Sequence, residues 1–256
     1  MEVGGVRGGG LVAAFPPGSS RRRPGEYSMN HWSPRMGALW PLTSHSIVDA
    51  AFPDIFSSQV RERSRSKIIP ASLLLEAYCT GIFPMAMENG DIAWFSPDPR
   101  GIIPLDAFHI PHGLKRSLQK EGFEIRLNTA FEAVIRACGE RAETWISEEI
   151  IESYINLHRL GFAHSVEAWL ENELAGGLYG VSVYGAFFGE SMFHKVPNAS
   201  KVALVGLVNR LNERGFRLLD TQYVTSHLTM FGAVEISRPK YMRLLKQALA
   251  LDCKFI

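Results

Sequence analysis

The stretch that decides the fold runs from residue 165 to residue 193 and reads SVEAWLENELAGGLYGVSVYGAFFGESMF. Turn-like breaks at residues 171–173 and 184–185 divide it into short runs rich in β-branched and aromatic side chains, as is typical of strands. Because such short connections join antiparallel neighbours, the stretch predicts a meander. Its three strands are Ser165–Leu170, Leu174–Val183 and Ala186–Phe193.

Segments with helical periodicity lie on both sides of this meander, and a fourth strand is predicted at Arg217–Val224. Ser147, followed by two glutamates, predicts an N-cap, and Gly161 closes the same helix. The mixture predicts an α+β core with a central, mostly antiparallel sheet and flanking helices. Helices are predicted from Pro70 or Ser72 to Gly81, and at His112–Lys120, Phe131–Arg141, Ser147–Leu160, Ala199–Arg214 and Lys240–Leu251.

Composition divides the chain into three parts. Residues 1–44 are rich in Gly, Pro, Ser and Arg without periodicity, which predicts a disordered extension. Residues 45–96 predict a small N-terminal domain with one helix. Residues 82–100, which end this domain and begin the next, are predicted to be mostly loop with short extended pieces. Residues 97–256 predict the main α+β domain.

Charge and cysteine content exclude several classes of protein. The net charge of +1 over 256 residues argues against a protein that coats nucleic acid through bulk positive charge. The three cysteines are few, odd in number and far apart, which favours a reducing compartment over a disulfide framework. No HExxH or paired-cysteine motif is present, and no apolar run approaches the roughly 18 to 20 residues that span a bilayer. We therefore expect a cytoplasmic protein without a metal and without membrane association.

Two polar residues interrupt the predicted strand FRLLDTQYV at residues 216–224. Asp220 and Gln222 are two positions apart, so a regular strand projects them on one face, with Leu219 and Thr221 on the other. A carboxylate beside a carboxamide can hold and polarise a substrate. The alternative is a structural polar pair that satisfies its own hydrogen bonds.

A carboxylate also lies inside the apolar run FFGESMF at residues 187–193. Regular alternation places Phe188, Glu190 and Met192 on one face and Phe187 and Phe193 on the other. An isolated buried carboxylate is costly, so Glu190 either forms an internal salt bridge or binds the ammonium group of a ligand.

Three further groups each allow a functional and a structural interpretation. Leucines at residues 204, 207 and 211 form a helical stripe that is either core or the wall of an apolar pocket, and Asn198 is the predicted cap of their helix. Trp145 and Tyr154 can stack on a base or pack in the core. Lys115 and Arg116 form a small basic patch, suited to phosphates or to solvent.

Seven segments of the sequence, which occur in the same order as in the family, resemble the leucyl/phenylalanyl-tRNA–protein transferases. These are bacterial enzymes that move an amino acid from charged tRNA to the N-terminus of a protein. The resemblance implies an acetyltransferase-like (GNAT-like) C-terminal domain that binds aminoacyl-tRNA in place of acetyl-CoA. The helix that would hold acetyl-CoA pyrophosphate opens with NASK, residues 198–201, and lacks the expected glycines, so no cofactor is expected. The segments are LLLEAYCTGIFPM, WFSPDPRGIIPLD, TWISEEIIESYINLHRLGFAHSVE, ELAGGLYGV, FFGESMF, NASKVAL and LLDTQ.

The resemblance also implies roles for individual residues. Asp220 and Gln222 would lie at the reaction centre, where the α-amino group of an N-terminal Lys or Arg attacks the ester of the donor, and Glu190 would contact the donor's α-ammonium group. Apolar side chains would surround the donor side chain, and Phe187 and Met192 can both do so only if a bulge intervenes or the strand is less regular. These side chains are Leu178, Phe187, Met192, Leu204, Leu207, Leu211 and Leu219.

For tRNA, the resemblance implies contacts with the 3′ adenosine and a basic patch formed by Lys115 and Arg116. The residues near the adenosine would be Tyr78, Met85, Trp145 and Tyr154, with Met85 standing where many relatives have tryptophan.

The implied function is the transfer of Leu or Phe, with Met as a further candidate, to proteins that begin with Lys or Arg, which marks them for N-degron proteolysis. A monomer is expected. The alternatives are an acetyltransferase-like enzyme with another acyl donor or acceptor, and a non-catalytic tRNA-binding relative.

Overall fold

The computed structural model describes residues 68–141 and 144–256. The predicted disordered extension, residues 1–44, and residues 45–67 of the predicted small domain lie outside the described residues. Within the described ranges, no helix has the length and apolar character needed to cross a membrane.

The predicted long helices and strands are all present, and most of them begin and end within two residues of the predicted bounds. The helices are α1 (Ala71–Cys79), η1 (Leu105–Ala107, a 3-10 helix), α2 (His112–Lys120), α3 (Phe131–Gly139), α4 (Glu148–Arg159), α5 (Ala199–Glu213), α6 (Ser226–Thr229) and α7 (Arg238–Leu249). The strands are β1 (Phe83–Ala86), β2 (Ile92–Phe95), β3 (Arg100–Ile103), β4 (Glu124–Leu127), β5 (Ala163–Leu170), β6 (Glu173–Val183), β7 (Ala186–His194), β8 (Leu218–Gln222) and β9 (Val234–Ile236).

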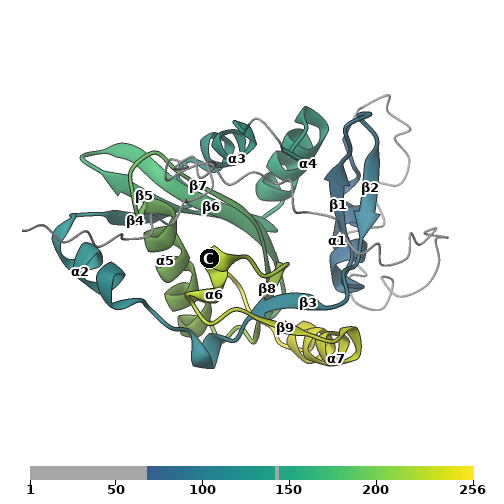
Figure 1. The fold of residues 1–256 in the computed structure, drawn as a ribbon. Helices are drawn as coiled ribbons and strands as arrows, with labels where there is room; N and C mark the ends of the chain where they lie inside the picture. Colours follow the sequence, from purple (N-terminus) through teal and green to yellow (C-terminus); the bar gives the residue numbers. More distant parts are fainter. Residues whose placement is uncertain (1–67, 142–143) are drawn as a thin grey trace, which may run out of the picture. The chain divides into compact units, whose positions relative to one another are not determined.

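In the described part of the chain, seven strands form one sheet in the order β4-β5-β6-β7-β8-β3-β9, and β1 and β2 form a separate hairpin. All neighbours in the large sheet are antiparallel except β7 and β8, which run parallel. Helix α5 makes the connection that a parallel pair requires, and it packs on β5 and β6 (Figure 1). The predicted α+β class with a mostly antiparallel sheet is confirmed.

The meander forms because its breaks have the backbone that tight turns need. Glu171, Asn172 and Tyr184 all have φ between 51° and 64°, the left-handed region that hairpin turns use. The predicted start of α4 is also confirmed, since the side chain of Ser147 accepts a hydrogen bond from the backbone N–H of Ile150. Asn198 precedes α5 as predicted, but its side chain makes no capping hydrogen bond there.

The sheet separates two apolar clusters. The first, here called the tyrosine-side cluster, includes buried residues of α1, α3, α4 and α7, with Tyr78, Tyr154 and Phe188 among them. The second, here called the leucine-side cluster, is built mainly by α5 with the other face of the strands. Figure 1 shows α5 on one side of the sheet and α3 and α4 on the other.

Candidate functional site

A bulge in β7 positions the carboxylate that the sequence singled out. Tyr179 of β6 pairs with Ser191, whereas the next residue, Gly180, pairs with Gly189, so that Glu190 is an extra residue without a partner. A Cβ at position 180 would lie 2.3 Å from a carbonyl oxygen of β7. Only glycine therefore permits this close approach of the two strands.

The bulge also corrects the predicted faces of β7. Phe188 and Phe193 both pack in the tyrosine-side cluster, although they are five positions apart. Phe187 is buried in the leucine-side cluster, and Met192 packs against the same cluster. The regular alternation that placed Met192 with Phe188 was wrong, because the extra residue Glu190 shifts the phase. Of the two explanations considered, the bulge is confirmed.

Glu190 meets polar groups from three elements. The hydroxyl of Tyr78, on α1, donates to its Oε1 at 2.8 Å, and the side-chain amide of Gln222 donates to the same oxygen at 3.4 Å. The hydroxyl of Tyr154, on α4, is hydrogen-bonded to that of Tyr78. Burial raises the pKa of Glu190 to about 8; the bond from Tyr78 opposes this rise and the nearby charge of Asp220 adds to it. The raised pKa favours the protonated form of Glu190, and a cation beside it would favour the ionised form.

Asp220 lies in the opposite electrostatic environment. It is fully buried, and Arg100 binds it with Nε 2.9 Å from Oδ1 and Nη2 2.6 Å from Oδ2. The hydroxyl of Tyr241 donates to Oδ2 at 2.6 Å, and the backbone N–H of Gln222 donates to Oδ1 at 2.8 Å. Each carboxylate oxygen therefore already accepts at least two hydrogen bonds. This geometry suits a residue that orients its neighbours better than one that takes a proton from a substrate.

Arg100 and Tyr241 are the residues that sequence reasoning missed. The Arg100 side chain is 1% exposed, donates from Nη1 to the Gly81 carbonyl at 3.0 Å, and lies over the rings of Phe83 and Tyr241 at 5.0 and 4.6 Å. Burial alone would lower the pKa of this guanidinium, but Asp220 and then Tyr241 raise it above its ordinary value. The sequence did contain one indication of Arg100, because the apolar strand RGII begins with a cation. A cation that is buried with such a strand requires an anion beside it.

Gln222 has an unusual backbone. Its φ is 57°, and the pairing of β3 with β8 shifts register so that Thr221 has no partner strand residue. The regular alternation that predicted one shared face does not apply across this irregularity. What joins Asp220 to Gln222 is the backbone hydrogen bond to Oδ1. A left-handed conformation costs a residue with a Cβ about 1–2 kcal/mol, and strain of this kind is typical of functional sites.

The predicted donor pocket residues lie together in the leucine-side cluster. Met192 is half-buried at its edge, and the other six are at most 3% exposed. The six are Leu178, Phe187, Leu204, Leu207, Leu211 and Leu219.

The residues predicted to contact tRNA form two separate groups. Tyr78 and Tyr154 are fully buried and bring hydroxyl groups to Glu190, rather than exposed ring faces. Met85 and Trp145 are half-buried and pack against the tyrosine-side cluster nearby. The basic pair at residues 115–116 is exposed on α2, which Figure 1 shows beside α5 and away from α1 and the β1–β2 hairpin.

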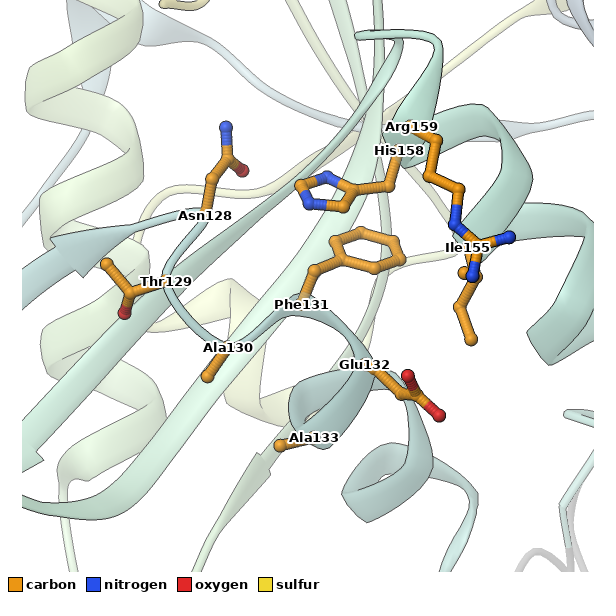
Figure 2. A pocket seen from close by; sticks show the side chains of 9 residues that line it. All are labelled: Asn128, Thr129, Ala130, Phe131, Glu132, Ala133, Ile155, His158 and Arg159. Atoms are coloured by element: carbon orange, nitrogen blue, oxygen red, sulfur yellow. The ribbon is translucent and has the colours of Figure 1, made fainter.

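A surface hollow of about 290 Å³ lies elsewhere, between the start of α3 and the end of α4. Figure 2 shows Phe131 and His158 face to face in it, with ring centroids 4.2 Å apart. None of the residues that line it belongs to the polar network around Glu190 and Asp220.

Comparison with known proteins gives matches along most of the described chain. The sequence model of the family described as leucyl/phenylalanyl-tRNA protein transferase matches residues 102–246, and that of its N-terminal domain matches residues 69–98. A leucyl/phenylalanyl-tRNA–protein transferase of Gloeobacter violaceus is 59% identical over 184 residues, which is 72% of this chain and 95% of the relative. Its counterpart in Paramagnetospirillum magneticum is 56% identical over 188 residues, 71% of this chain and 90% of the relative.

A third relative of the same name, from Herpetosiphon aurantiacus, is 54% identical over 191 residues, 74% of this chain and all of the relative. Among solved structures, L-PGS from Bacillus licheniformis matches with a TM-score of 0.40 and 15% identity, covering 59% of this chain and 65% of that one.

The sheet with its helices, the polar network and the extent of these matches together define an aminoacyltransferase. The chain belongs to the leucyl/phenylalanyl-tRNA protein transferase family. The predicted family and enzyme class are confirmed.

Proposed function

We propose that this enzyme transfers a leucyl or phenylalanyl group from aminoacyl-tRNA to the α-amino group of a protein whose first residue is Lys or Arg. The nitrogen forms an amide bond with the donor's carbonyl carbon, the ester bond to the terminal ribose breaks, and one amine proton passes to the ribose oxygen. The observation that carries the proposal is the contact between the Gln222 amide and the Glu190 carboxyl group, on adjacent strands of the sheet.

The donor end is assigned to Glu190 and the leucine-side cluster. A carboxyl group whose pKa is raised by burial ionises readily when an ammonium group arrives, because the cation replaces lost solvation. The α-ammonium of the donor provides such a cation. An apolar enclosure favours Leu, Phe and Met side chains over polar ones, which would lose their hydrogen bonds on burial.

The acceptor end is assigned to Gln222. Its Nε2 donates toward Glu190, which leaves the side-chain carbonyl oxygen to accept a hydrogen bond from the attacking amine. An α-amino group has an ordinary pKa of about 7.7–8.0, so a useful fraction is neutral near neutral pH, and catalysis consists mainly of positioning. Asp220 contributes by orienting Gln222, and its charge is balanced by Arg100.

The tRNA end is assigned to the two groups described above. The half-buried Met85 and Trp145 are suited to pack against the terminal adenosine, which adjoins the donor amino acid, while the buried hydroxyls of Tyr78 and Tyr154 hold Glu190 behind them. Lys115 and Arg116 would reach phosphates through their exposed charges. We further propose that the enzyme acts as a monomer in the cytoplasm and marks its products for N-degron proteolysis.

The test is transfer of labelled Leu from leucyl-tRNA to a peptide that begins with Arg, with the same peptide beginning with Ala as the control. Label is expected on the Arg peptide alone. Transfer only from acetyl-CoA would favour another acyltransferase, and binding of leucyl-tRNA without transfer would favour a non-catalytic relative. Either result would overturn the proposal.

A further inference from the structure

We propose that Tyr241, on the C-terminal helix α7, is a positioning residue for the transfer reaction and acts on Gln222 through Asp220. The inference rests on the proposed function of Gln222. It extends the site to a helix to which sequence reasoning assigned no role in transfer.

Tyr241 brings its side chain into the polar network from helix α7. It is 2% exposed, and its hydroxyl makes a short bond of 2.6 Å to Asp220 Oδ2. Its ring lies under the guanidinium of Arg100 at 4.6 Å, and Arg100 binds both oxygens of the same carboxylate. Tyr241 therefore fixes the carboxylate directly and also through Arg100.

The orientation of this carboxylate matters because Gln222 depends on it. Oδ1 of Asp220 accepts the backbone N–H of Gln222, whose φ of 57° is unfavourable without such a contact. The bond from the Gln222 side chain to Glu190 is long, 3.4 Å, and cannot alone hold the amide in place. If the carboxylate rotates, the backbone of Gln222 and then its amide shift from the position that the attacking amine requires.

A buried tyrosine can also serve stability alone, so the experiment must separate the two roles. Tyr241→Phe keeps the ring over Arg100 and removes one hydroxyl. Tyr179→Phe is the matched control, because Tyr179 is fully buried and its hydroxyl has no hydrogen-bond partner among the described residues.

Single-turnover transfer from leucyl-tRNA to an Arg peptide is measured for both variants, with thermal unfolding in parallel. Tyr241→Phe is expected to lower the transfer rate at saturating substrates about tenfold, as for loss of a hydrogen bond to a charged group, and to change the affinity for leucyl-tRNA less than about twofold. Tyr179→Phe is expected to keep the wild-type rate.

The decisive step repeats Tyr241→Phe in a Gln222→Ala background. If Tyr241 acts through Gln222, adding Tyr241→Phe to the Gln222→Ala variant has no further effect on the transfer rate. An equal loss in both backgrounds, or no loss in the wild-type background, would overturn the inference. Should Tyr241→Phe fail to fold, Arg100→Lys carries the same test, since lysine keeps the charge but cannot bind both oxygens. A wild-type enzyme that transfers nothing would overturn the proposed function itself, whereas an active one with additive losses overturns only the role of Tyr241.

Discussion

Two carboxylates on adjacent strands, Asp220 on β8 and Glu190 on β7, are held in opposite ways. Asp220 is fully buried and paired with Arg100, and its oxygens accept bonds from Tyr241 and Gln222. Glu190 forms no ion pair with any residue that the structure describes, and its burial raises its pKa to about 8. The first carboxylate is neutralised from within the protein, whereas the second needs a cation from outside. The difference separates a positioning group from a ligand-binding group.

The largest effect is expected when the internal pair is broken. Asp220→Asn leaves the guanidinium of Arg100, 1% exposed, without its counter-charge. Removing one partner of a buried ion pair destabilises a protein by about 3–5 kcal/mol. Urea unfolding should show a loss of this size in the free energy of unfolding, together with loss of transfer activity.

The control for this substitution is Glu132→Gln. Glu132 pairs with Arg136 on the exposed face of α3, and exposed pairs contribute about 0–1 kcal/mol. If both variants lost the same free energy of unfolding, the pair formed by Arg100 and Asp220 would not have the structural role assigned to it.

A smaller effect, confined to the donor, is expected at the other carboxylate. Glu190→Gln keeps the size and the hydrogen-bonding oxygen but removes the charge that the donor's ammonium would meet. A hydrogen bond to a charged group contributes about 1.5–3 kcal/mol, so the affinity for leucyl-tRNA should fall roughly tenfold to a hundredfold. Filter binding measures the affinity of both proteins for leucyl-tRNA. N-acetylated leucyl-tRNA, which has no ammonium group, is the control ligand. Equal losses for both ligands would remove Glu190 from the donor site.

Sequence alone predicted the strands of the meander and the long helices, because each has enough residues to show its period. The short strands β3, β4 and β9, with three or four residues each, were missed, because so few positions do not establish an alternation. Asp220 could be recognised because it is polar in an apolar strand. Its partners could not, since Arg100 lies 120 residues away and Tyr241 lies on a separate helix.

The bulge shows a second limit of sequence reasoning. The apolar pattern of β7 indicates a strand, but only the close contact at Gly180 reveals that Glu190 is inserted between paired residues. A register shift depends on the neighbouring strand, so the sequence of one strand does not determine it.

The smallest effect is a pH dependence of stability at Glu190. Folding raises the pKa of Glu190 from 4.5 to about 8, so between these values the folded protein keeps a proton that the unfolded chain has released. The free energy of unfolding therefore receives a negative contribution that is absent below about pH 4.5, grows as pH rises, and is complete above about pH 8. Glu190→Gln removes this contribution, so the variant should gain stability relative to wild type as pH rises.

Urea unfolding of both proteins at pH 6 and pH 8 gives the test, because the difference between them cancels the titration of every other group. The Glu190 side chain is half-buried, so solvent partly screens its charge. We therefore expect the difference in free energy of unfolding between Glu190→Gln and wild type to grow by on the order of 1–2 kcal/mol from pH 6 to pH 8. A pH-independent difference for Glu190→Gln would mean that Glu190 is already ionised in the folded protein, and the distinction between the two carboxylates would then rest on their hydrogen bonds alone.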